Sequence, residues 1–112
     1  MGIVELKNDR IAIGVNTHGA ELVSLKSNET DREYMWCGDA AYWGRVSPVL
    51  FPFVGKLENQ TYRHDGVTYE GIPQHGFARD SEFVVAEQTE DTVWFELVKD
   101  EKWQKNYPFD FT

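Results

Sequence analysis

Cysteine and long apolar runs are scarce or missing in this sequence, and each shortage excludes a class of protein. Cys37 is the only cysteine, so no disulfide can form within the chain and no Cys-x-x-Cys metal or redox pair exists. No stretch of 18 apolar residues occurs, and the amino-terminal residues lack the layout of a signal peptide. We therefore expect a soluble cytoplasmic protein.

Basic residues and familiar catalytic motifs are also few. The 11 lysines and arginines against 19 aspartates and glutamates give a net charge of -8. Nucleic acids and anionic membranes bind clustered basic side chains, so neither is expected as a partner, whereas a small anionic ligand responds to local charge. The sequence contains no Gly-rich phosphate loop, no His-Glu-x-x-His and no Gly-x-Ser-x-Gly, and its carboxylates form no identifiable acid pair.

What the sequence does contain is a series of short strand-like runs. Of its 112 residues, 41% are apolar and 14% are aromatic, which is enough for the core of one domain. The alternating or apolar runs cover residues 3–7, 10–15, 21–26, 61–64, 67–70, 83–88, 92–98 and 107–112. Asp65-Gly66 is a strong signal for a hairpin turn. Short strands with frequent turns predict an all-β, antiparallel β-sandwich.

Three segments need separate interpretation. Residues 38–59 are too apolar for a solvated linker and are expected to form an ordered loop over a core. Residues 100–106 predict one helical turn with Trp103 facing inward, and the strand pattern around Trp94 predicts a core position. Residues 107–112 end in an apolar run with no polar tail, which fits either a domain that ends on a strand or a chain cut from something longer.

The run from Pro73 to Asp80 holds the strongest candidate site. In an extended backbone every second side chain shares a face, so His75, Phe77 and Arg79 would point the same way. An imidazole that exchanges a proton near neutral pH, a flat apolar platform and a fixed cation suit a small hydroxyl-rich or anionic molecule. The alternative for His75 is a histidine that orders its own loop through hydrogen bonds to the backbone.

Arginines near this run are candidate ligand contacts. Each guanidinium, of Arg79 and of Arg45, could bind a ligand hydroxyl or phosphate, or could pair with a carboxylate, and Asp80 is the carboxylate nearest to Arg79 in the sequence. Arg45 precedes an apolar run, where an unpaired charge would be costly. Lys56 and Asn59 are weaker candidates, because exposed lysines and turn asparagines are common.

Two motifs in succession carry a family resemblance. Residues 47–55 read SPVLFPFVG and residues 72–79, after a predicted hairpin, read IPQHGFAR. With GAEL at residues 19–22 and YPFDF at residues 107–111, they resemble the aldose 1-epimerase (galactose mutarotase) family, in particular its LacX-like and hexose-6-phosphate mutarotase branches. The resemblance extends along essentially the whole chain, and the HGFAR element after the Phe-Pro loop is its most specific part.

The resemblance implies a large antiparallel β-sandwich that interconverts the α and β anomers of an aldose or aldose 6-phosphate without a metal or organic cofactor. A base removes the C1 hydroxyl proton, an acid protonates the ring oxygen, and the opened ring closes on the other face. His75 resembles the first of two family histidines, which binds the sugar and assists at the ring oxygen. Arg79 resembles the arginine after it, Arg45 resembles an arginine of the sugar-phosphate branch, and Lys56 lies where other members carry a basic residue.

Family members are much longer than this chain, and their second histidine and catalytic glutamate lie beyond residue 112. The resemblance therefore implies that residues 1–112 are a single partial domain, the N-terminal part of such a sandwich, and inactive alone. A rival hypothesis is a non-catalytic carbohydrate-binding sandwich, and a third is an interaction domain whose aromatic residues only build the core. The expected partner is a small sugar or sugar phosphate, and no oligomeric state is predicted.

Overall fold

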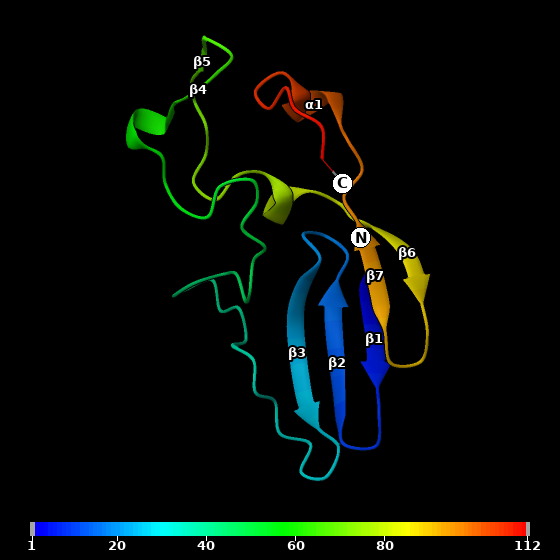
Figure 1. The fold of residues 1–112 in the computed structure, drawn as a ribbon. Coiled ribbons are helices and arrows are strands. Elements are labelled where there is room, and N and C mark those ends of the chain that lie inside the picture. The colour runs from blue at the N-terminus through cyan, green and yellow to red at the C-terminus, as the bar shows by residue number, and fades with distance from the viewer. Residues whose placement is uncertain (1, 112) are drawn as a thin grey trace.

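The computed structural model describes residues 2–111, and its regular elements are mostly antiparallel strands, as predicted (Figure 1). The main sheet has the order β1-β2-β3, with β1 at Ile3–Lys7, β2 at Ile11–Asn16 and β3 at Glu21–Ser27. The side-chain oxygen of Asn8 accepts hydrogen bonds from the amides of residues 10 and 11, at 2.8 and 2.9 Å. This Asx-type turn closes the first hairpin.

The main sheet has one apolar and one mixed face, because side chains alternate along each strand. Leu6, Ile13 and Leu25 lie opposite one another across the three strands, and Leu6 is buried. The next register row, on the other face, contains Glu5 and Gly14. The alternation read from the sequence is therefore the alternation that the sheet uses.

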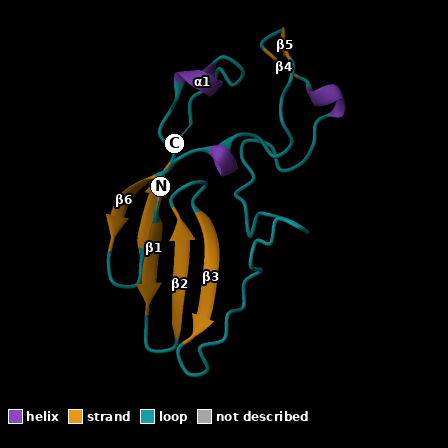
Figure 2. Cartoon of the chain, turned by 180° about the vertical axis from the view of Figure 1, so that it is seen from behind, coloured by secondary structure: helices purple, strands orange, loops and turns teal. Residues whose placement is uncertain are grey.

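Two more hairpins follow. The first pairs β4, Tyr62–His64, with β5, Val67–Tyr69, through the predicted Asp-Gly turn. The second pairs β6, Val84–Gln88, with β7, Val93–Glu96. Figures 1 and 2 both show β4–β5 standing away from the main sheet, whereas β6–β7 lies close to β1.

Helical structure is confined to short turns. The 3-10 helices η1, Glu58–Gln60, and η2, Ala78–Asp80, lie in segments for which no helix was predicted. The four-residue helix α1, Glu101–Gln104, confirms the predicted helical turn, and Trp103 is buried in it. Among residues 2–111, no helix has the length and apolar character needed to cross a membrane.

The predicted strand at residues 107–112 is wrong for the part of it that the structure describes. Residues 107–111 contain no strand, and residue 112 lies outside the described residues. The apolar side chains of this segment pack inward instead of entering a ladder: Tyr107 is buried, and Phe109 and Phe111 pack against the same core. Burial of apolar surface thus decides the conformation here, where strand propensity alone suggested another outcome.

The core is small and aromatic. Ile72, Phe77, Trp103 and Tyr107 form its buried cluster. The Phe77 and Trp103 rings stack with centroids 4.1 Å apart and planes 11° apart. Burial raises the pKa of the Tyr107 hydroxyl, and the neighbouring Tyr62 adds to the effect. This cluster joins the segment after His75 to the last described residues of the chain.

Residues 28–57 form a long loop without a strand, and polar contacts fasten its start to the sheet. The Glu33 carboxylate accepts hydrogen bonds from Ser24 Oγ at 2.5 Å and from Leu25 N at 2.7 Å, and also from the two amides that follow it. These donors, Ser24 first, lower the pKa of Glu33 to about 2. The predicted ordered loop at residues 38–59 is confirmed by other contacts: Phe51, Phe53 and Leu57 pack against the core, and the amides of residues 46 and 47 donate to Glu21.

Candidate functional site

The candidate site forms where the His75 segment runs beside the Phe-Pro loop. The amide of His75 donates to Gly55 O at 3.1 Å, and the amides of residues 77 and 78 both donate to Phe51 O, at 3.0 and 3.2 Å. A parallel bridge pairs Phe51 with Gly76. Two segments separated by the β4–β5 hairpin are thereby held side by side.

The predicted extended run through His75, Phe77 and Arg79 is wrong. His75 and Gly76 have φ angles of 68° and 73°, and η2 begins at residue 78. Two consecutive left-handed residues turn the chain, so the alternation of an extended strand does not apply. The three side chains therefore do not share one strand face.

The His75 imidazole is fixed by the loop that it faces. Its Nδ1 lies 2.6 Å from the carbonyl oxygen of Val54, and its Nε2 lies 3.0 Å from Nε2 of the Gln74 side-chain amide. The backbone hydrogen bond expected for a loop-ordering histidine is therefore present. It uses Nδ1 and leaves Nε2 as the nitrogen that can meet a ligand.

Arg79 lies close to the same histidine through Gln74. Its NH2 group donates to the backbone carbonyl oxygen of Gln74 at 3.2 Å. Its Nε is buried, has no hydrogen-bond partner among the described residues, and lies 3.9 Å from Asp80 Oδ2. The structure thus gathers an imidazole and a guanidinium around one residue, Gln74.

Arg45 reaches this region from the long loop. Its NH2 group donates to Asp80 Oδ1 at 2.8 Å, so the carboxylate pairing considered for both arginines is strongest for Arg45. Asp80 is about half exposed, and the side chains of Arg45 and Arg79 are 34% and 21% exposed. Two guanidiniums share one carboxylate, which leaves local positive charge in an acidic chain.

Lys56 and Asn59 come from the loop and from η1, which precede the β4–β5 hairpin. Lys56 is exposed and follows Gly55, whose carbonyl accepts the His75 amide. Asn59 is exposed within η1 and has a φ of 54°. The amide of Ile72 donates to Gln60 O at 2.9 Å, which holds η1 beside residue 72, just before the run from Pro73 to Asp80. The positions of Lys56 and Asn59 are set by the backbone hydrogen bonds of their segments.

Phe77 belongs to the core. It is 8% exposed and one face of its ring is covered by Trp103. Together with Asp80 it also borders a cleft of about 460 Å³ that is lined by His18, Glu82 and Lys102 among others. The flat platform predicted beside His75 is therefore mostly occupied by protein.

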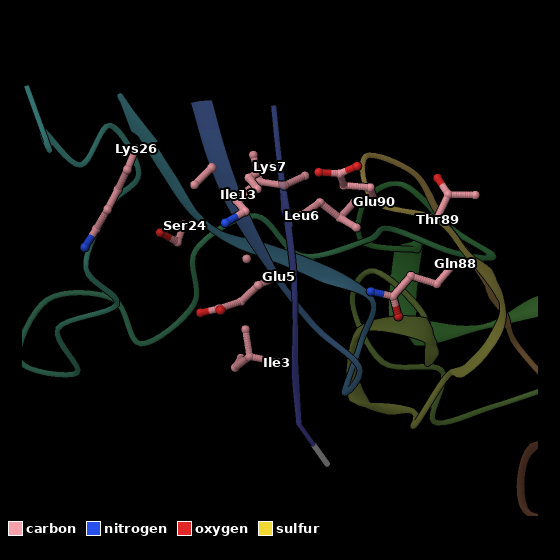
Figure 3. Close-up of a pocket in the computed structure, with 12 residues that line it drawn as sticks. Ile3, Glu5, Leu6, Lys7, Ile13, Ser24, Lys26, Gln88, Thr89 and Glu90 are labelled. Atoms are coloured by element: carbon pink, nitrogen blue, oxygen red, sulfur yellow. The ribbon is translucent and has the colours of Figure 1, made fainter. Parts of the chain in front are cut away.

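A second hollow, of about 480 Å³, lies at the main sheet beside the β6–β7 turn, and its lining includes Leu6 and Ile13 as well as residues of the mixed face (Figure 3). Small residues of β2 and β3 form its floor, and Glu5, Lys7 and Lys26 surround it together with residues 88–90 from the β6–β7 turn. None of the predicted site residues lines this hollow. The candidate site is therefore the histidine–arginine region, which is separate from it.

Sequence reasoning missed two parts of the site. Gln74 was not singled out, although its position next to His75 was a usable signal. The Val54 carbonyl had no signal, because a backbone acceptor 21 residues away cannot be identified from residue types. Asp80 was considered only as a partner of Arg79, whereas its short contact is with Arg45.

Comparisons with known proteins agree on one family. The family model described as aldose 1-epimerase matches residues 2–112. The chain is 36% identical over 112 residues to the chromosomal protein LacX of Lactococcus lactis subsp. lactis. This match covers 96% of the chain and 37% of LacX. The chain is 27% identical over 123 residues to a putative glucose-6-phosphate 1-epimerase of Escherichia coli K12, with 100% and 38% covered.

A solved structure gives the same result for the fold. The galactose mutarotase related enzyme from Lactobacillus acidophilus matches with a TM-score of 0.92 and 42% sequence identity, over 96% of this chain and 36% of that chain. The predicted mutarotase-like antiparallel sandwich is thus confirmed as the fold class. The chain spans a little over a third of the length of the relatives it matches.

Proposed function

Because the chain belongs to the aldose 1-epimerase family, we propose that it is the sugar-binding N-terminal part of a mutarotase acting on an aldose or an aldose 6-phosphate. The observation that carries the proposal is that the fixed imidazole of His75 and the guanidinium of Arg79 both contact Gln74. A proton-exchanging group and a hydrogen-bond fork at one place suit the hydroxyls of a sugar. The expected setting is cytoplasmic carbohydrate metabolism, without a metal or organic cofactor.

Each residue has a distinct role in this proposal. His75 exchanges a proton or a hydrogen bond with the sugar through Nε2, because Nδ1 is used by Val54. Arg79 and Arg45 bind hydroxyl or phosphate oxygens. Arg45 does so while still sharing Asp80 or after releasing it. The exposed Lys56 and Asn59 contact the outer part of the substrate. Phe77 supports the site from the core, with any sugar contact limited to its remaining exposed edge.

Anomer exchange needs a base for the C1 hydroxyl and an acid for the ring oxygen. Within residues 2–111, the histidine–arginine region offers the imidazole of His75, guanidiniums that stay protonated, and the Asp80 carboxylate, which is already paired with Arg45. One group cannot perform both transfers in the same step. We therefore expect negligible turnover by the 112-residue chain alone, and robust turnover by that chain would contradict this expectation.

The test is NMR exchange spectroscopy on a protein of the relatives' length that carries this segment, with glucose, galactose and their 6-phosphates as substrates. We expect His75→Ala to lower the exchange rate between anomers by about 100-fold or more, the range typical of a lost acid–base group. His64→Ala, in the β4–β5 hairpin, is the matched control and should keep the rate. An unchanged rate in His75→Ala would remove His75 from the mechanism, and sugar binding without exchange would favour the carbohydrate-binding alternative.

A further inference from the structure

Both ring nitrogens of His75 have a polar partner in the structure. A carbonyl oxygen can only accept a hydrogen bond, so the 2.6 Å contact with Val54 O requires a proton on Nδ1. An amide nitrogen of glutamine can only donate, so the 3.0 Å contact between Gln74 Nε2 and His75 Nε2 requires a lone pair on that ring nitrogen. Together the two contacts specify one neutral tautomer, with the proton on Nδ1.

We propose that Gln74 is a positioning residue that, with the Val54 carbonyl, holds neutral His75 with its proton on Nδ1 and its lone pair on Nε2. The catalytic meaning of this arrangement rests on the function proposed above. In that reaction a neutral His75 is an acceptor: it takes a hydrogen bond or a proton from a sugar hydroxyl at Nε2 and has no proton there to give to the ring oxygen.

The arrangement also makes Gln74 a competitor of the sugar. The Nε2 lone pair can accept from one donor at a time, so a sugar hydroxyl and the Gln74 amide cannot both use it. The Gln74 side chain is exposed and can rotate away, and a sugar hydroxyl then takes the place of the Gln74 amide as the donor to Nε2. Donation from His75 to the sugar ring oxygen requires a second proton, on Nε2. The Gln74 amide must then present its oxygen, and not its nitrogen, to the imidazole.

Gln74 connects this histidine to the neighbouring cation as well. Its backbone carbonyl accepts from Arg79 NH2 at 3.2 Å while its side chain caps His75. The side chain can therefore rotate without breaking the contact that holds Arg79. A substitution at Gln74 changes the partner of the imidazole and leaves the backbone acceptor in place.

The test reads the tautomer directly. Long-range ¹H–¹⁵N correlation spectra of the ¹⁵N-labelled 112-residue chain, without sugar, distinguish the two neutral tautomers and the doubly protonated ring, and His75→Ala assigns the signals. We expect the Nδ1–H form to dominate. Gln74→Glu keeps the shape but replaces the donor with a charged acceptor, so the doubly protonated fraction near neutral pH should rise by about threefold or more.

Gln88→Glu, on the exposed strand β6, is the matched control because it adds the same charge elsewhere. A dominant Nε2–H tautomer, or equal His75 spectra in the two variants, would overturn the proposal. The readout needs neither sugar nor turnover. A failure of anomer exchange in a longer protein would therefore count against the proposed function alone.

Discussion

At the residue scale, the site depends on the left-handed backbone at His75 and Gly76, with φ angles of 68° and 73°. A left-handed conformation costs an ordinary residue about 1–2 kcal/mol. For His75 the backbone and ring hydrogen bonds to the Phe-Pro loop offset that cost. For Gly76 the reason is space, since an added Cβ would overlap Phe51 O and Pro52 Cδ. This close approach sets the direction of the imidazole.

We expect Gly76→Ala to destabilise the chain by about 3 kcal/mol or more, because the backbone strain and the overlap with Phe51-Pro52 act together. Gly66→Ala is the matched control: Gly66 also has a positive φ, of 77°, but its added Cβ would meet no atom within 4 Å. Only the conformational cost of about 1 kcal/mol should remain there. Urea unfolding followed by tryptophan fluorescence measures both, and equal losses would show that the close approach is unimportant.

At the element scale, strand β3 anchors the loop that brings Arg45 to the site. Glu21 Oε2 accepts from the amides of Val46 and Ser47 at 2.9 and 3.0 Å. The Ser47 hydroxyl donates to Leu22 O at 2.6 Å. A carboxylate that receives two amide hydrogen bonds is a strong, charge-assisted clamp. The position of Arg45 is therefore set by contacts with the sheet as well as by Asp80.

We expect Glu21→Ala to release this loop and to lower the free energy of unfolding by about 1–3 kcal/mol, because two partly buried amides lose a charged acceptor. Hydrogen exchange measured by NMR should show a larger increase in exchange rate at Val46 and Ser47 than at the amides of β1 and β2. Glu87→Ala, on exposed β6, serves as the control. Equal exchange at Val46 and Ser47 in both variants would mean that Glu21 does not hold the loop.

At the scale of the whole molecule, the described chain is extended and leaves much apolar surface open. Its radius of gyration is 16.7 Å, whereas about 13 Å is typical of a compact domain of this length. Every residue of β6 is exposed, including Val84 at 46%, and Trp94 on β7 is 64% exposed. An exposed apolar hairpin with unpaired strand edges favours association with other protein surfaces.

We expect the 112-residue chain to bind the apolar dye ANS and to self-associate through the β6–β7 hairpin. Val84→Lys should weaken self-association by about fivefold or more, because burying a lysine at a contact costs at least about 1 kcal/mol. Val67→Lys, in the separate β4–β5 hairpin and 51% exposed, is the control. Analytical ultracentrifugation across a concentration series measures both. The β6–β7 hairpin is not the contact if Val67→Lys weakens association as much.

Local chemistry explains how much of this molecule could be predicted. The hairpin at Asp65-Gly66, the alternation of β1 to β3 and the inward Trp103 depend on residues within a few positions of one another. The choice of His75, Arg79 and Arg45 as candidate residues also came from local motifs. Such features need only turn preferences, side-chain alternation and residue type.

Features that depend on distant segments required the tertiary structure. The Val54 carbonyl that fixes His75 is 21 residues away, and Asp80 is 35 residues from Arg45. Trp94, predicted to be buried, is exposed because within the described residues no layer covers its face of the hairpin. Phe77 turns into the core because two left-handed residues precede it and Trp103 stacks on it. Which side chains meet, and which ring nitrogen of His75 faces Val54, follow from how separate segments pack rather than from spacing along the chain.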